Sequence, residues 1–196
     1  MRKRRAGRPP SYSSFKNGRR RRKGRRAPRP HRVRGLQLMM RAFRLTDQKW
    51  AATAFDGEGA RRFGGRWNHR GSAVAYTSES LALATLEQLV HVPAGIPLAG
   101  RVAIRVDIPL ELAIRTILPD ELPEGWRRVD GLRALKTMGS EWILSQESAV
   151  LRVPSVIIPS EFNLLFNPSH PDLARLTFHP PEPYAFDPRL LSAPSG

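Results

Sequence analysis

The sequence predicts an α+β domain, in which strands and helices are mixed along the chain without a regular strand–helix–strand alternation. Four segments have the composition or the alternation of strands, at residues 41–45, 73–77, 101–108 and 149–158. Two segments have helical patterns, at residues 80–91 and 132–146, and no internal repeat is visible. Because a parallel sheet needs regular strand–helix–strand units, this order favours α+β over a doubly wound sheet.

Residues 101–108 (RVAIRVDI) carry the clearest strand pattern, because their apolar side chains alternate and fall on one face. The β-branched and aromatic content of AVAYT at 73–77 favours a strand, and RAFRL at 41–45 is a shorter candidate. Strand signals lie on both sides of Pro154 in the segment AVLRVPSVII. Since proline is disfavoured inside a central strand, we expect an edge, a bend or a bulge there.

The two helices are predicted from their end signals and apolar faces. Ser78 or Ser80 can cap the first helix, and Pro93 and Gly95 stop it. The apolar side of the second helix consists of Leu132, Leu135, Trp142 and Ile143. After Asn167 the chain is rich in proline, and we expect it to be irregular.

The positive charge of the chain is concentrated at its amino terminus. The 196 residues have a formal net charge of +16, but residues 1–35 hold 16 of the 33 Lys and Arg, and the remainder is formally neutral. We expect residues 1–38 to be a disordered basic tail and residues 39–196 to form one domain. The tail could bind RNA, DNA or acidic lipid, act as a localisation signal, or result from a misassigned start codon before Met39.

Composition excludes several classes of protein. The chain has no cysteine, which excludes disulfides, cysteine-bound zinc and a thiol nucleophile. Its five histidines have no metal-ligand spacing, and no GxSxG motif of a hydrolase is present. No apolar run approaches the roughly 18 residues that span a bilayer. We therefore expect a cytoplasmic protein with no metal and no membrane contact.

Glu87 is the most informative residue of the first predicted helix. It falls on the same face as Leu83, Leu86 and Val90, and most other positions of this helix are also apolar. An unpaired buried carboxylate costs several kcal/mol or takes up a proton. Glu87 is therefore predicted to have a cationic partner, a hydrogen-bonding partner or a cleft to face; a structural ion pair or an exposed helix edge is the alternative.

Three other residues are candidates for substrate contact. The glycine-rich segment 55–71 is predicted to be a loop, in which two glycines precede Arg66, whose planar guanidinium suits the oxygens of a phosphate. Tyr76 ends the AVAYT strand, and Ser148 begins the following ESAVLRVPSV stretch. Taken alone, each also fits an ordinary structural role: a solvated arginine, a packed tyrosine and a strand-entry serine.

The ordered combination of these segments resembles the RES domain, the toxin component of bacterial Xre–RES toxin–antitoxin modules. The resemblance runs from about residue 41 to 188 and rests on GGRWN, AVAYTSES, ALATLEQLVH and ESAVLRVPSVIIPSEFNLLFNPSHP. By position, Arg66, Tyr76, Glu87 and Ser148 match the arginine, tyrosine, glutamate and serine of the family. The family implies a fold similar to that of ADP-ribosyltransferase toxins.

The resemblance also implies an enzyme that uses NAD as a substrate rather than as a cofactor. It would cleave the nicotinamide–ribose bond, with phosphate or water as acceptor, and arrest growth. Glu87 would stabilise the positive charge on the ribose, Arg66 would bind the pyrophosphate, Tyr76 would stack on nicotinamide, and Ser148 would bind the substrate. The implied partner is an Xre-type helix-turn-helix antitoxin, through which alone the chain would contact DNA.

Two alternatives remain open at the level of sequence. The chain could be an ADP-ribosyltransferase that modifies a protein, or a nucleic-acid-binding protein that acts through its arginine-rich tail. The neutral charge of the body argues against the second alternative. Deletion of residues 1–38 would separate them, because the enzymes would keep their activity and the binding protein would lose its function.

Overall fold

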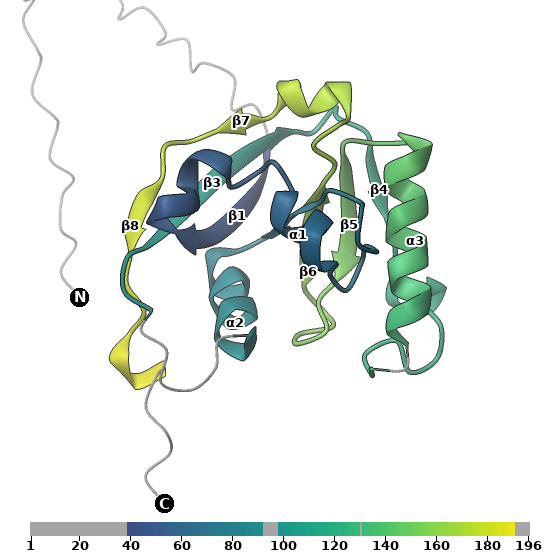
Figure 1. Cartoon of the computed structure of the whole chain (residues 1–196), viewed down its shortest axis with the longest axis horizontal. Helices are drawn as coiled ribbons and strands as arrows, with labels where there is room; N and C mark the ends of the chain where they lie inside the picture. Colours follow the sequence, from purple (N-terminus) through teal and green to yellow (C-terminus); the bar gives the residue numbers. More distant parts are fainter. Residues whose placement is uncertain (1–38, 92–97, 130, 191–196) are drawn as a thin grey trace, which may run out of the picture. The chain divides into compact units, whose positions relative to one another are not determined.

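A computed structural model of the chain describes residues 39–91, 98–129 and 131–190. The predictions for residues 1–38, and the stop signals Pro93 and Gly95, lie outside the described residues. In the described part, one sheet of eight strands combines with the α-helices α1 (Glu58–Phe63), α2 (Leu81–His91) and α3 (Leu132–Ser145). The predicted α+β class is thereby confirmed (Figure 1).

The strands follow the order β4-β5-β6-β2-β1-β3-β7, and β8 also pairs with β3. Their bounds are β1 Met39–Asp47, β2 Ala75–Ser78, β3 Arg101–Pro109, β4 Ile114–Thr116, β5 Val150–Pro154, β6 Phe162–Phe166, β7 Thr177–Phe178 and β8 Glu182–Tyr184. Only the β4–β5 pair is parallel among these described strands. Short 3-10 helices occupy Gln48–Thr53, Pro119–Glu121, Pro171–Arg175 and Pro188–Leu190.

The sheet divides into two halves at the seam between β1 and β2. Strands β1 and β3 are paired along their whole length, from Met39↔Pro109 to Asp47↔Arg101. In contrast, β1 and β2 share the single registered pair Phe43↔Ser78. Because the two strands diverge beyond that pair, the main chain at the seam has hydrogen-bonding groups that the sheet itself does not use.

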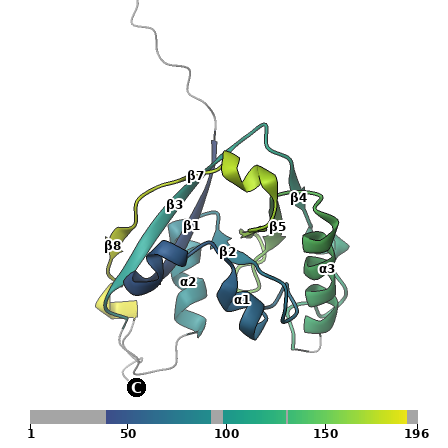
Figure 2. The same cartoon turned by 45° about the horizontal axis from the view of Figure 1, so that its top comes forward.

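Helices cover the two halves of the sheet separately. Figures 1 and 2 show α3 beside β4 and β5, and α2 beside the β1 half. Leu135 and Trp142 of α3 pack with Leu151 of β5 in one core cluster. Ala84 of α2 packs with Leu45 of β1 in another. The helix that carries Glu87 is therefore held against the sheet beside the seam.

The structure differs from the sequence predictions at three places. The predicted strand 149–158 ends at Pro154, after which the chain bends, as the proline suggested. Helix α1 lies inside the segment that was predicted to be a loop, and the short strands β7 and β8 lie in the proline-rich region. In the described residues, no helix is long and apolar enough to cross a membrane.

Candidate active site

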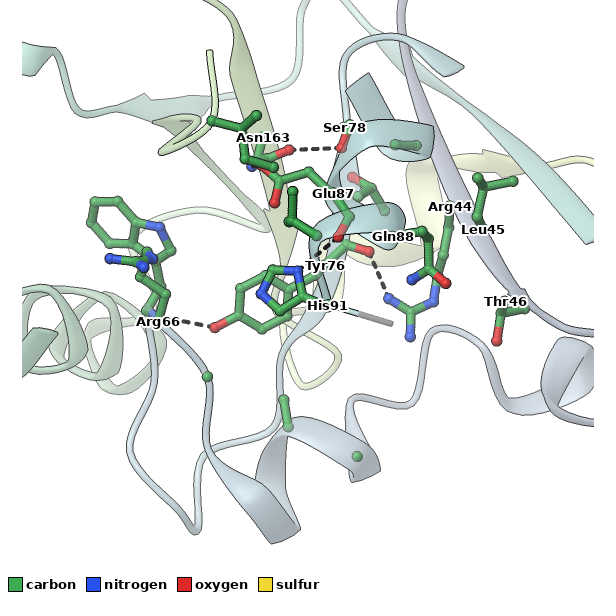
Figure 3. Close-up of a pocket in the computed structure, with 18 of the residues that line it drawn as sticks. Arg44, Leu45, Thr46, Arg66, Tyr76, Ser78, Glu87, Gln88, His91 and Asn163 are labelled. Atoms are coloured by element: carbon green, nitrogen blue, oxygen red, sulfur yellow. Dashed lines mark hydrogen bonds between the residues drawn. The ribbon is translucent and has the colours of Figure 1, made fainter. Parts of the chain in front are cut away.

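The two halves of the sheet enclose a cleft of about 760 Å³. Its walls come from β1, β2, α1, α2, the loop 64–67 and the chain just after β5 (Figure 3). Arg66, Tyr76 and Glu87, three of the four residues predicted from the sequence, line this cleft together. Glu87 is the one acidic side chain among the described residues of its lining, whereas three arginines line it.

Glu87 lies on α2 and is held by two side-chain donors. The Ser155 hydroxyl donates to Glu87 Oε1 at 2.9 Å, and Asn163 Nδ2 donates to the same oxygen at 2.6 Å. Figure 3 shows Glu87 beside Asn163 at one side of the cleft. Of the partners that the sequence allowed for this carboxylate, the structure supplies both hydrogen-bond donors and a cleft.

Ser155 reaches Glu87 because β5 ends one residue before it. The Ser155 main chain turns away from the strand and its N–H donates to the Glu161 carbonyl at 2.8 Å. Its side chain is fully buried, and Oγ accepts from the N–H groups of Ile157 and Ile158 at 3.1 and 3.2 Å. The turn thus fixes the hydroxyl under the carboxylate.

The loop that carries Arg66 is braced by Tyr76. The tyrosine hydroxyl donates to Asn68 Oδ1 at 2.7 Å and accepts from the Trp67 N–H at 3.1 Å. Two close approaches require glycine: a Cβ on Gly65 would lie 2.4 Å from the Tyr76 hydroxyl oxygen, and one on Gly139 of α3 would lie 1.9 Å from the Trp67 carbonyl oxygen. Trp67 is buried and anchors the loop in the core.

Arg66 extends from this loop into the cleft with unused hydrogen-bonding capacity. Its Nη1 is buried and has no hydrogen-bond partner in the described part of the chain. Burial lowers the pKa of the Arg66 guanidinium from its ordinary value, and the facing Glu87 carboxylate opposes that effect. Since the group stays protonated at physiological pH, it offers a partly desolvated cation to an anionic ligand.

Two further arginines of the cleft were not predicted from the sequence. Arg44 of β1 donates from Nη1 to the Tyr76 carbonyl at 2.6 Å, across the seam. Its Nε and the Nε of Arg101 are buried and lack hydrogen-bond partners among the described residues. Figure 3 shows Arg44 and Arg66 on opposite sides of Tyr76, so the cleft has cationic groups along its length.

Ser148 does not lie at this cleft, and the prediction that it binds substrate requires correction. It is buried between α3 and β5, where its hydroxyl accepts from Trp142 Nε1 at 3.0 Å and donates to the Val150 carbonyl at 2.9 Å. Its hydrogen-bonding groups are therefore used within the core. Ser155, seven residues further along the same stretch, is the serine that contacts Glu87.

The missed residues left only weak signals in the sequence. Ser155 and Asn163 are single polar residues inside the apolar runs VPSVII and FNLLF, a pattern that also occurs at strand ends. Arg44 is a charged residue between Phe43 and Leu45 in a strand. Such residues need a partner or a cleft when buried, but their positions in the sequence do not show which.

Within 39–91, 98–129 and 131–190, no three His, Asp or Glu side chains lie close enough together to bind a metal. The described lining of the cleft offers a ligand one carboxylate, several hydrogen-bond donors and three guanidinium groups.

Comparison with known structures identifies the class of fold. A chain in the crystal structure of the M. tuberculosis MbcT–MbcA toxin–antitoxin complex matches with a TM-score of 0.61. The match covers 76% of this chain and 85% of that chain at 19% sequence identity, so it shows a common fold. The α+β domain with its split sheet thus has the fold of a component of a toxin–antitoxin complex.

Sequence comparison identifies the family. The RES domain model matches residues 41–187, and the chain belongs to the RES domain family. It is 39% identical over 145 residues to the "Prs ADP-ribosylating toxin" of Sphingobium sp. strain YBL2, covering 72% of this chain and 89% of that protein. It is 36% identical over 152 residues to "Toxin Res" of Yersinia enterocolitica, covering 77% and 99%. The resemblance predicted from the sequence is confirmed.

Proposed function

We propose that this RES domain chain is the toxin of a toxin–antitoxin pair and cleaves the bond between nicotinamide and ribose in NAD. The observation that carries the proposal is the pairing of Glu87, the one acidic residue of the described cleft lining, with Arg66 and two further arginines. Relatives whose names describe toxins support the same assignment.

A carboxylate in this position fits the charge that develops during the cleavage. When the C1′–N bond breaks, its electron pair moves to the nicotinamide ring nitrogen and leaves a positively charged ribose. Glu87 would stabilise that cation through space or accept a hydrogen bond from a ribose hydroxyl. Because the carboxylate is already held by Ser155 and Asn163, it needs little reorganisation as the charge forms.

The arginines fit the anionic part of the same substrate. Arg66 and Arg44 each have a buried nitrogen without a partner among the described residues, which would donate a charge-assisted hydrogen bond to the diphosphate oxygens. The Tyr76 ring lines the cleft between them and would pack against nicotinamide or its ribose. The volume of about 760 Å³ lies within the ordinary range of small-molecule sites.

Product analysis with the full-length protein tests this proposal and names the acceptor. NAD would be incubated in phosphate buffer and in phosphate-free buffer, with Glu87→Gln as the inactive control. Nicotinamide release by the wild type alone would support the cleavage. ADP-ribose-1″-phosphate formed only with phosphate would name phosphate as the acceptor, and free ADP-ribose in both buffers would name water.

A third product would identify the alternative function, in which the ADP-ribose group is transferred to a protein. ADP-ribose label that appears on added cell protein, with none free in solution, would identify a transferase; this outcome deserves testing because one relative is named an ADP-ribosylating toxin. Intact NAD under every condition would contradict the proposal.

The antitoxin partner is also a proposal. We infer that a small Xre-type helix-turn-helix protein covers the cleft and neutralises the toxin in the cytoplasm, and that the chain meets DNA only through it. Expression of the chain alone should arrest growth and lower cellular NAD, whereas the Glu87→Gln variant should do neither. Co-expression of the protein encoded next to the gene should restore growth; continued arrest would contradict its role as antitoxin.

A further inference from the structure

We propose that Asn163 and Ser78 are positioning residues that fix the Glu87 carboxylate so that only its Oε2 oxygen is offered to a ligand. Asn163 Nδ2 lies 2.6 Å from Glu87 Oε1, and the Ser78 hydroxyl lies 2.7 Å from Asn163 Oδ1. A chain of two hydrogen bonds thus runs from the sheet to the carboxylate. This inference rests on the proposed function for its effect on catalysis, but not for its geometry.

The direction of each hydrogen bond follows from counting donors and acceptors. Ser155 Oγ accepts from the N–H groups of Ile157 and Ile158, so its two lone pairs are used and its one proton is left for Glu87 Oε1. An ionised carboxylate only accepts, so Asn163 must turn its amide nitrogen toward Glu87 and its oxygen toward Ser78. The Ser155 hydroxyl and the Asn163 amide therefore each have a single orientation in which all of these hydrogen bonds form.

The two donors leave Glu87 with one available oxygen. A carboxylate oxygen has about two acceptor sites, and Oε1 uses both for Ser155 and Asn163. No described residue donates to Oε2, which therefore remains for the ribose of a bound substrate. Rotation of the carboxylate would break both bonds, so its orientation is fixed before the substrate arrives.

The sheet makes this arrangement rigid. Ser78 of β2 and Asn163 of β6 are directly paired across the two strands, so their side chains project from the same face. Ser78 is also the β2 residue that pairs with Phe43 of β1, at the end of the seam. The two hydrogen bonds therefore tie Glu87, which belongs to a helix, to the point where the two halves of the sheet meet.

Isosteric substitution separates positioning from packing. Asn163→Asp keeps the shape of the side chain but places a second carboxyl group against Glu87, so kcat for nicotinamide release should fall roughly 10- to 100-fold with little change in the Kd for NAD. Asn167→Asp is the matched control, because the Asn167 side chain also donates and accepts hydrogen bonds but lies outside the cleft. It should leave kcat unchanged at equal folded fraction.

A double substitution tests whether Asn163 acts through Glu87. In the Glu87→Gln background, Asn163→Asp should cause no further loss of the residual rate, since the group that it positions is already changed. Ser78→Ala should lower kcat by about 5-fold in the wild type and not at all in the Asn163→Asp variant. Losses that multiply independently in the double variants would overturn the proposal.

An NMR measurement tests the geometry without any activity. In full-length protein labelled with ¹⁵N, the side-chain amide protons of Asn163 should shift markedly between the wild type and Glu87→Gln, and again in Ser78→Ala. The amide protons of Asn167 should stay unchanged. Absence of the Asn163 shift would overturn the proposal, whereas intact NAD with the shift present would overturn only the proposed function.

Discussion

The Arg44 guanidinium lies 2.6 Å from the main-chain oxygen of Tyr76 and bridges β1 and β2 where the two strands diverge. The carbonyl is thereby satisfied by a side chain in place of a strand neighbour. The same guanidinium keeps its buried Nε without a partner among the described residues, at the wall of the cleft. One side chain thus closes the gap in the sheet and supplies a donor to the site.

Arg44→Lys is expected to weaken both roles, because an ammonium group cannot reproduce the two directions of a guanidinium. Loss of the bond to the Tyr76 carbonyl should lower the free energy of unfolding by about 1–3 kcal/mol. The KM for NAD should also rise. Urea unfolding and steady-state kinetics would measure the two effects, with Arg41→Lys, an exposed arginine of the same strand, as control. Equal stability and KM in both variants would contradict this role of Arg44.

Glu87→Gln should lower the rate of NAD cleavage by about 100- to 1,000-fold, as expected when one preorganised electrostatic group is lost. The glutamine keeps the size of the side chain and an oxygen that can accept from Ser155. Binding of NAD, followed by calorimetry, should change little, because the carboxylate acts on charge that forms during the reaction. A near-normal rate would remove Glu87 from the mechanism.

Much of the fold could be predicted from the sequence, because its signals are local. Alternation identified β3, and the spacing of apolar residues identified α2 and α3 to within one or two residues. In contrast, α1 lies in a short glycine-rich segment, where Gly57 with φ of 70° begins it and Gly64 with φ of 75° ends it. A helix of six residues between glycines has too few apolar positions to show a period.

The candidate site was predicted where a residue is unusual in its own element. Glu87 is a carboxylate in an apolar helix, and Arg66 follows two glycines. Ser155 and Asn163 were missed because their importance depends on contacts with Glu87 across 68 and 76 positions of the chain. For the same reason the sequence does not distinguish Ser148 from Ser155: both are serines of one strand-like stretch, and only the fold shows which one turns toward α2.

Arg66→Ala should raise the KM for NAD more than it lowers kcat, because the guanidinium is proposed to bind the diphosphate in the ground state and in the transition state alike. Arg62→Ala is the matched control: Arg62 is an exposed arginine four residues earlier, paired with Glu58 and outside the cleft. Steady-state kinetics on both variants would test this. A KM that is unchanged in Arg66→Ala would contradict the assignment.

Ser148→Ala and Ser155→Ala should differ in their effect on kcat. The first leaves the buried Trp142 Nε1–H and the Val150 carbonyl without their partner, so the free energy of unfolding should fall by about 1–3 kcal/mol with kcat unchanged. The second removes a donor to Glu87 and the acceptor of two main-chain N–H groups, so both kcat and the free energy of unfolding should fall. Chemical unfolding and turnover of both variants would decide. A lower kcat in fully folded Ser148→Ala would contradict the placement of Ser148 outside the active site.

The stability of the domain should fall at alkaline pH through Tyr76. Burial raises the pKa of its phenol above the ordinary value near 10, although the Trp67 N–H and the Arg66 charge oppose this. Below pH 10 the phenol is protonated in the folded and unfolded states, so its ionisation costs nothing. Above that pH the unfolded chain loses the proton first, and unfolding becomes favoured as the pH rises.

The Tyr76→Phe variant isolates this effect, since it lacks the ionisable group. Its free energy of unfolding should be lower than that of the wild type at pH 8, because Asn68 Oδ1 and the Trp67 N–H lose the hydroxyl between them. From pH 9 to 11 the wild-type value should decline more steeply, and the difference between the two proteins should narrow. Urea unfolding at each pH gives both slopes. Parallel slopes would mean that the Tyr76 phenol ionises as readily in the folded protein as in the unfolded chain, and its burial at the cleft would then not hold in solution.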